Sequence, residues 1–253
     1  MASRDAIIAF CDELLEIGSY EDYGPNGLQV PGAEEVSGIA TGVSANAEFL
    51  RRAVDGGAEL AVVHHGLLWG GPLEPFSVPM AERLRTLLCA RASLAAYHLP
   101  LDAHAEIGNN ALLRDRLGLD PDERPFGEAK GRHIGAIGRA SPPLSISELE
   151  DRLREATGRD PLSFDSGPER IEAVGIVTGG GGFAVHEAGP IGLDALVIGE
   201  PSEPLMAEAR EYGVHLLAGG HYATETFGIG RLGELVAERF GVDHEFIDVP
   251  NPV

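Results

Sequence analysis

Residues 59–66, ELAVVHHG, form a short apolar run that ends in two adjacent histidines. A run of this length, closed by polar residues and a glycine, is typical of a buried strand. We therefore predict a strand over residues 59–63 that leads directly into His64 and His65. Imidazole nitrogens are frequent ligands of divalent metal ions, so the same stretch also indicates where chemistry takes place.

Two other segments end apolar runs in the same way. HLPLDAH, residues 98–104, follows an expected strand over 93–97, and GHYATE, residues 220–225, follows one over 214–217. Together with residues 63–66 these segments hold five of the nine histidines and two carboxylates, Asp102 and Glu225. A histidine pair with separate carboxylates supplies more ligands than one tetrahedral ion needs, which predicts a site for two metals.

Strand and helix patterns alternate outward from these segments. Such alternation predicts an α/β fold with parallel or mixed sheets flanked by helices, whose ligands gather beyond the carboxyl ends of the strands. Ser145 and Glu148 predict a capping box at one helix start. The expected strands cover 38–43, 133–139, 172–177, 195–198 and 244–249, and the expected helices cover 7–15, 46–55, 80–90, 109–117, 145–156, 203–212 and 224–240.

The composition of the chain changes at residues 120–132, which indicates a boundary between two subdomains. This stretch is rich in proline, glycine and charge and has no apolar period. We therefore expect two interlinked subdomains: a discontinuous metal-site subdomain of residues 1–120 and 190–253, and a smaller α/β subdomain of residues 130–190.

The charge balance excludes some partners. The chain has 40 acidic and 19 basic residues, a net charge of −21, whereas nucleic-acid phosphates are held by Lys and Arg, so we expect no nucleic-acid partner. An acidic surface with a single lysine, Lys130, suits a cytoplasm of very high salt, and we hypothesise a halophilic source. A GC-rich genome that favours arginine codons explains the same composition.

No apolar run reaches the roughly 18 residues of a membrane span, and the first residues lead into an amphipathic pattern rather than a secretory signal. We expect a cytoplasmic protein with no membrane partner. Cys11 and Cys89 are far apart and have no C-x-x-C partner, which argues against a disulfide framework or a thiolate cluster.

Several other residues have two interpretations. Gly179–Gly182 could approach a phosphate, but the stretch lacks the lysine of a P-loop, and a tight turn is favoured. Trp69 could stack on a flat substrate or pack a loop. His98 and His104 could be direct ligands, proton-transfer residues or residues that orient a ligand. Solvated or structural roles are expected for His133, His186, His215 and His244.

Four blocks of the chain carry a resemblance to a known family. They are NGLQV (26–30), VHHGLLW (63–69), HLPLDAH with GNNA (98–104 and 108–111) and GGHYATE (219–225). They resemble, in order, the signature blocks of the Nif-three-like family, also called dinuclear metal-centre hexameric proteins or GTP cyclohydrolase 1 type 2 homologues. The likeness spans nearly the whole chain and implies the Nif-three-like fold.

The resemblance implies a role for particular residues. The metal ligands would be His64, His65, Asp102, His221 and Glu225, holding two divalent ions per subunit (Zn, Fe, Mn, Ni or Co). His98 would line the same cavity as a further ligand or a proton-transfer residue. The family also implies a ring-shaped homohexamer. The chain departs from the family pattern at residues 41–46, TGVSAN, where many members have an aspartate, and after Gly199-Glu200, where PSEP replaces histidines.

Two metal ions can activate a water and polarise a carbonyl, imine or phosphoryl oxygen, which predicts a metal-dependent hydrolase with a small-molecule substrate. The family's name implies attack of such a water on C8 of guanine with release of formate. The metal-bearing segments contain no Lys or Arg to hold a triphosphate. Two alternatives remain open: a metal-storage or metal-delivery protein, and a regulatory scaffold that metal ions only brace.

Overall fold

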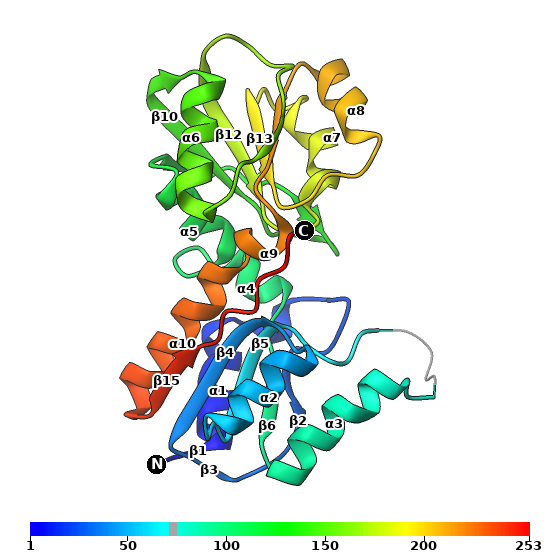
Figure 1. The fold of residues 1–253 in the computed structure, drawn as a ribbon. Coiled ribbons are helices and arrows are strands. Elements are labelled where there is room, and N and C mark those ends of the chain that lie inside the picture. The colour runs from blue at the N-terminus through cyan, green and yellow to red at the C-terminus, as the bar shows by residue number, and fades with distance from the viewer. Residues whose placement is uncertain (71–74) are drawn as a thin grey trace. The chain divides into compact units, whose positions relative to one another are not determined.

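The computed structural model describes residues 1–70 and 75–253 and divides the chain into two compact units (Figure 1). Unit 1 comprises Met1–Leu101 and Gly228–Val249, and unit 2 comprises Asp102–Phe227 and Pro250–Val253. The mixed α/β class is confirmed in both. The limits differ from the expected 1–120, 130–190 and 190–253, because the first two strands after residue 190, Ala195–Ile198 and His215–Ala218, belong to the sheet of unit 2.

Unit 1 is built on a five-stranded sheet in the order β15-β4-β5-β6-β2. β15, β4, β5 and β6 run parallel, and β2 pairs antiparallel with β6. The central strands are apolar and buried along almost their whole length, as expected when helices cover both faces of a parallel sheet. The bounds are β15 Asp243–Phe246, β4 Gly38–Ser44, β5 Leu60–His65, β6 Ser93–Ala96 and β2 Gly27–Val30.

Side-chain caps start two helices of unit 1, and α1 (Arg4–Leu14) begins three residues before the expected 7–15. Ser3 caps α1 and Asn46 caps α2 (Ala47–Asp55) through their side-chain oxygens. α2 lies in front of the sheet in Figure 1, and with α3 (Val78–Ala90) it buries an apolar cluster against β4, β5 and β6. α1 meets α10 (Thr226–Phe240) through Phe10 and Phe240, whose ring centroids are 5.6 Å apart.

Unit 2 is built on a six-stranded sheet in the order β11-β14-β13-β12-β10-β7. β12, β13 and β14 are parallel, and the outer strands pair antiparallel. Residues 120–132, which the sequence assigned to an element-free boundary, instead supply β7, β8 and the start of β9. The bounds are β7 Asp120–Asp122, β8 Glu128–Ala129, β9 Arg132–His133, β10 Ala136–Leu144, β11 Leu162–Phe164, β12 Ile171–Val177, β13 Ala195–Ile198 and β14 His215–Ala218.

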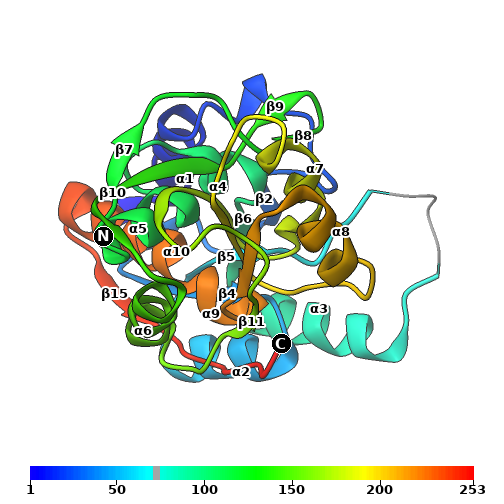
Figure 2. The same cartoon turned by 90° about the horizontal axis from the view of Figure 1, so that it is seen from above.

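Helices pack on both faces of the unit 2 sheet. α5 (Asn109–Arg116) and α6 (Ile146–Thr157) share an apolar cluster with alternate residues of β12, β13 and β14, and the residues of opposite parity are buried as well. In Figure 2, α6 lies on one side of the strands and α7 (Val185–Ala188) and α8 (Leu205–Tyr212) on the other. The predicted capping box at Ser145 and Glu148 is confirmed.

The histidine-bearing segments follow strands of two different sheets. His64, His65 and His98 belong to strand ends of unit 1, and His221 follows β14 in unit 2. The expected position of these histidines directly after strands is confirmed within each unit, and the strands belong to two different sheets. The expected helix 224–240 is also two helices, α9 (His221–Thr224) and α10, which are interrupted at Glu225.

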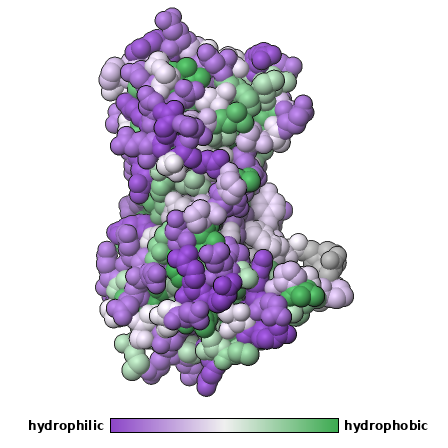
Figure 3. Space-filling model, viewed as in Figure 1, coloured by the Kyte–Doolittle hydropathy of each residue, from purple (hydrophilic) through white to green (hydrophobic). Residues whose placement is uncertain are grey.

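The surface agrees with the composition. On the face shown in Figure 3, hydrophilic residues predominate and hydrophobic ones form small separate areas. Among the described residues, no helix combines the length and apolar character that crossing a membrane requires.

Candidate metal centre

Three histidines come together in unit 1. His64 and His65 are the last two residues of β5, and His98 follows the neighbouring parallel strand β6 by two residues. Each of the three offers a ring nitrogen, and these nitrogens lie within 4.8 Å of one another. Strand ends at one edge of a parallel sheet therefore gather three imidazoles, the kind of donor that Zn²⁺, Fe²⁺ and similar ions accept.

Hydrogen bonds orient the first two rings. His64 is fully buried, and its Nδ1 donates to the carbonyl oxygen of Tyr97 at 2.9 Å. Because a carbonyl can only accept, Nδ1 carries the proton and Nε2 keeps the lone pair that a metal ion needs. His65 Nδ1 lies 3.2 Å from the hydroxyl of Ser44, its register partner on β4.

His98 forms a tight pair with Asp22, a residue that the sequence analysis missed. His98 Nδ1 lies 2.7 Å from Asp22 Oδ1, and the aspartate side chain is only 2% exposed. Asp22 also accepts hydrogen bonds from the backbone N–H of Leu99 and the side chain of Asn26. Burial alone would raise the pKa of Asp22, but the His98 and Asn26 hydrogen bonds outweigh it and lower that pKa.

Aromatic rings surround His98. The Trp69 ring meets it edge-on with centroids 5.3 Å apart and lies 5.9 Å from the His65 ring, while Tyr23 lies 6.1 Å from His98. Trp69 remains 49% exposed, so part of its ring is accessible beside the histidines. Its stacking role stays a prediction.

In unit 2, Asp102 lies on the short helix α4 (Leu99–Ala103) and is 6% exposed. Its Oδ1 accepts a hydrogen bond from Asn109 Nδ2 at 2.8 Å. Asn110 fixes the same region, since its side chain donates to the carbonyls of Asp102 and Ile134 and accepts from the Thr178 N–H. Both asparagines are buried, which explains the paired Asn-Asn of the GNNA block.

His221 and Glu225 form the other part of the unit 2 donor set. His221 Nε2 lies 3.3 Å from Glu225 Oε2, and His221 Nδ1 lies 3.2 Å from Glu200 Oε1. Burial alone would lower the pKa of His221, but the carboxylates of Glu225 and Glu200 raise it to about 9. Glu225 is 3% exposed, and its carboxylate lies within 4.8 Å of that of Asp102.

Gly179 provides the space beside these residues. It follows β12, has a φ of +61°, and a Cβ built there would overlap Glu225 Oε1 and lie 3.1 Å from His221 Nε2. Its N–H donates to Thr224 Oγ1 at 3.2 Å, and its carbonyl accepts from the N–H groups of Gly199 and Glu200. The favoured turn at Gly179–Gly182 is therefore confirmed, and a side chain at 179 would collide with the donor set.

The donor sets fit divalent metal ions by their chemistry. Unit 1 supplies the imidazoles of His64, His65 and His98, and unit 2 supplies the carboxylates of Asp102 and Glu225 with the imidazole of His221. Nitrogen and carboxylate donors suit Zn, Fe, Mn, Ni or Co. The two cysteines belong to other elements: Cys11 is buried in α1 and Cys89 is exposed on α3.

The remaining histidines have other partners. His104 Nδ1 accepts from the backbone N–H groups of Glu106 and Ile107, so it caps a turn. His215 bonds to Pro168 O, and His244 to Thr41 Oγ1. These contacts agree with the structural roles expected for His215 and His244.

Comparison with known proteins agrees with the motifs. The family model Duf34/NIF3 (NGG1p interacting factor 3) matches residues 2–252. A GTP cyclohydrolase 1 type 2 homolog from Deinococcus radiodurans is 39% identical over 247 residues, 98% of this chain and 93% of the relative. One from Pyrococcus abyssi is 42% identical over 248 residues, 98% of each chain.

Solved structures give the same result. Protein ybgI, described as of unknown function, superposes with a TM-score of 0.93 at 39% identity over 100% of both chains. A protein from Thermus thermophilus gives a TM-score of 0.88 at 33% identity, again over 100% of both chains. The resemblance drawn from the four sequence blocks is confirmed, and this chain belongs to the Duf34/NIF3 family.

Proposed function

We propose that this chain is a metal-dependent hydrolase that binds two divalent cations through His64, His65, Asp102, His221 and Glu225. The observation that carries the proposal is the pair of donor sets, each at strand ends and each oriented by hydrogen bonds from neighbouring groups. Orientation of this kind is typical of metal ligands and is costly for residues without a function. When bound, such ions supply an acidified water and polarise the substrate's oxygen or nitrogen.

Hydrogen bonds would hold the proposed metal ligands in fixed orientations. His64 and His65 present ring nitrogens whose direction is set by Tyr97 O and Ser44. Asn109 holds Asp102 in one orientation, so the carboxylate keeps one oxygen toward its hydrogen-bond donor. These fixed positions would lower the reorganisation that binding and catalysis require.

We propose His98 as the residue that moves a proton. Asp22 fixes its tautomer by accepting from Nδ1, which leaves Nε2 to take a proton from, or give one to, the reacting group. The nearby rings of Trp69 and Tyr23 limit access of water around the imidazole.

The substrate class follows from the relatives' name, GTP cyclohydrolase 1 type 2 homolog, and is part of the proposal. We propose hydrolytic opening of a purine-like ring. The ring-shaped homohexamer implied by the resemblance is also a proposal, and light scattering coupled to size exclusion tests it.

Metal analysis combined with turnover tests the function. The wild-type chain is reconstituted with each candidate metal, freed of excess ion, and screened against purine nucleosides and nucleotides. Glu225→Ala and Asp102→Ala should lose both bound metal and turnover, whereas the control Glu211→Ala, at an exposed position of α8, should keep both.

Two outcomes would contradict the proposal. Reversible transfer of metal to an acceptor without turnover of any compound would favour storage or delivery. A lower melting temperature on metal removal, again without turnover, would favour a braced scaffold.

A further inference from the structure

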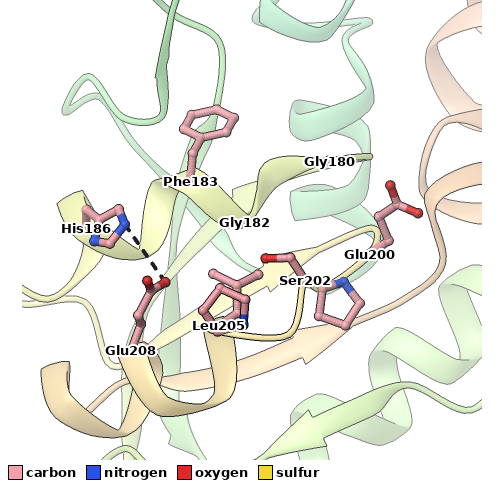
Figure 4. A pocket seen from close by; sticks show the side chains of 10 residues that line it. Gly180, Gly182, Phe183, His186, Glu200, Ser202, Leu205 and Glu208 are labelled. Carbon is pink, nitrogen blue, oxygen red and sulfur yellow. Dashed lines mark ion pairs between the residues drawn. The ribbon is translucent and has the colours of Figure 1, made fainter.

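A cavity of about 380 Å³ in unit 2 is lined by charged groups that already have partners (Figure 4). Glu208 Oε2 lies 3.9 Å from His186 Nε2, and Glu200 Oε1 lies 3.2 Å from His221 Nδ1. The Phe183 ring points away from Glu208 in Figure 4. The carboxylates of this lining are thus engaged within unit 2, whereas the histidine site of unit 1 has a half-exposed aromatic side chain beside it.

That side chain is Trp69, and it belongs to the loop of residues 66–70 that follows β5. Its ring lies 5.9 Å from the His65 ring and 5.3 Å from the His98 ring, although 49% of the residue is exposed. Contact with two imidazoles offsets only part of the entropy that is lost when a half-exposed side chain and its loop are ordered. The hydrogen bonds of the loop backbone therefore decide where the ring lies.

The Gln29 side chain holds the first half of this loop. Its Oε1 accepts the backbone N–H groups of Leu67 at 2.8 Å and Leu68 at 3.2 Å, and its Nε2 donates to the Pro25 carbonyl at 2.9 Å. Because one atom must accept and the other must donate, an amide at this distance from the backbone satisfies all three partners. Gln29 thus ties the loop after β5 to the segment before β2.

A β-bulge directs Gln29 toward the loop. In the pairing of β2 with β6, Leu28 is opposite Ala95 and Val30 is opposite Leu94. Gln29 is therefore the extra residue of β2. An extra residue changes the direction of a side chain at that point of a strand, and such bulges are common beside active sites. Since β6 lies between β2 and β5 in the sheet, the Gln29 amide reaches past a neighbouring strand.

The loop has room for this amide and is attached at its other end as well. A Cβ at Gly66 would overlap the Gln29 amide and the Ala96 side chain, so a glycine is needed there. At the far end, the N–H of Gly70 donates to the Tyr23 carbonyl. Trp69 therefore lies between two attachments, and both of them lead to the chain just before or within β2.

We propose that Gln29 is a positioning residue that fixes Trp69 over the histidines of this site. The Trp69 ring thereby shields His65 and His98 from water, and Gln29 acts through Trp69. The shield strengthens the hydrogen bond between His98 and Asp22 and limits proton exchange between His98 and bulk water. Its value for catalysis rests on the proposed function, in which His98 moves a proton.

Fluorescence tests the position of the ring, because Trp69 is the only tryptophan of the chain. Gln29→Met keeps the length of the side chain and removes its three hydrogen bonds. In the metal-free full chain we expect emission at longer wavelengths, a faster anisotropy decay, and acrylamide quenching raised about 2-fold, the ratio of full exposure to 49%. Gln29→Glu keeps the acceptor for the two N–H groups and should lie between Gln29→Met and wild type.

The reaction of histidines with diethyl pyrocarbonate, located by mass spectrometry of peptides, tests the shield itself. His98 is now 19% exposed, so it should react roughly 3-fold or more faster in Trp69→Ala and in Gln29→Met, and His65 should follow it. Because Gln29 acts through Trp69, the double variant should react no faster than Trp69→Ala alone. His186, which is 58% exposed in unit 2, should react equally in all variants.

Two further variants serve as controls. Glu35→Met places the same side chain at an exposed position of β3 (Glu35–Val36) in the same unit, and it should change neither measurement. Gly66→Ala keeps Gln29 in the chain but displaces its amide, and it should reproduce the fluorescence of Gln29→Met. Circular dichroism and a cooperative melt show that each variant is folded, and Gln29→Glu carries the test if Gln29→Met does not fold.

Three results would overturn the assignment. They are equal fluorescence of Gln29→Met and wild type, unchanged reactivity of His65 and His98 in Trp69→Ala, and a double variant in which the two effects on reactivity add.

Cobalt separates this inference from the proposed function. Co²⁺ has unpaired electrons that quench a nearby indole, whereas Zn²⁺ has a filled d shell, so Co²⁺ but not Zn²⁺ should quench Trp69 in the wild-type chain. Quenching should be weaker in Gln29→Met. If Co²⁺ leaves the wild type unquenched while Gln29→Met shows the expected anisotropy and reactivity, the metal site is overturned and the role of Gln29 stands.

Discussion

The two donor sets differ in how the fold holds them. The histidines of unit 1 are oriented by neutral or paired groups: a carbonyl for His64, a hydroxyl for His65 and the buried Asp22 for His98. In unit 2 the carboxylates of Glu225 and Glu200 flank the imidazole of His221, Asp102 lies near Glu225, and a glycine leaves space beside Glu225. The donor set of unit 1 depends on its hydrogen-bond partners. The donor set of unit 2 depends on the space left by Gly179 and on the ion pairs of His221 with the carboxylates.

The largest effect that would test this contrast is expected at Gly179. Gly179→Ala places a Cβ against Glu225 Oε1 at a φ of +61°, so we expect a loss of unfolding free energy of about 3 kcal/mol and at least roughly a 10-fold loss of metal affinity. Chemical denaturation and metal titration measure the two effects.

Gly180→Ala is the matched control, because a Cβ there meets nothing within 4 Å and its φ is −76°. Equal unfolding free energies of the two variants would show that the stability of unit 2 does not depend on the absence of a side chain at position 179.

The next effect concerns the paired histidine of unit 1. Asp22→Asn keeps the size of the side chain but removes the charge that fixes His98 Nδ1–H, so we expect turnover to fall about 100-fold with metal content unchanged. Steady-state kinetics and metal analysis of the same samples check this.

Glu21→Gln, at an exposed neighbour, serves as the control. A loss of metal in Asp22→Asn would make His98 a ligand rather than a proton-transfer residue.

A smaller effect is expected for the hydrogen bond that Asn109 donates to Asp102 in unit 2. Asn109→Ala removes the donor to Asp102 Oδ1, and we expect metal affinity to fall about 10-fold, as for other partners of metal ligands. Asn109→Asp would place a second carboxylate against Asp102 and should lower the metal affinity more than Asn109→Ala does. Equal affinity of wild type and Asn109→Ala would show that Asp102 needs no orienting partner.

The smallest effect is a dependence of stability on pH away from both donor sets. Hydrogen bonds from Arg124 and Arg139 lower the pKa of Asp122 in β7 from 3.8 to about 2. Because the folded-state pKa is the lower one, the stabilisation is present above about pH 4 and is lost as the pH falls toward 2.

Asp122→Asn should therefore cost up to about 1 kcal/mol at pH 7 and progressively less as the pH falls through 2, allowing for screening at the surface. Asp120→Asn, at an exposed position of the same strand, is the comparison. A difference between wild type and Asp122→Asn that does not change between neutral and acid pH would contradict this account.

Local patterns predicted the elements that carry the donors. The apolar run before His64, the capping box at Ser145 and the runs of β13 and β14 were each visible in the sequence because they depend on neighbours in the chain. The choice of strand partner depends on residues far away, so the sequence did not show which strands share a sheet. β7 was missed because Asp120–Asp122 has no apolar pattern.

The same reason explains the missing site residues. Asp22 lies in a polar loop where nothing local separates it from Glu21, and only its hydrogen bonds to His98 and Leu99, more than 70 residues away, distinguish it. The importance of Gly179 likewise depends on Glu225 in space.

Gly179 and Gly199 lie so close that a Cβ at 199 would approach within 2.7 Å of the Gly179 Cα. The two stretches of main chain are therefore in direct contact beside the carboxylate of Glu225, and neither glycine has room for a side chain. Any change of metal preference over evolutionary time would then come from the side chains around these two glycines and not from the glycines themselves. Homologues that prefer different metal ions should keep glycine at both positions.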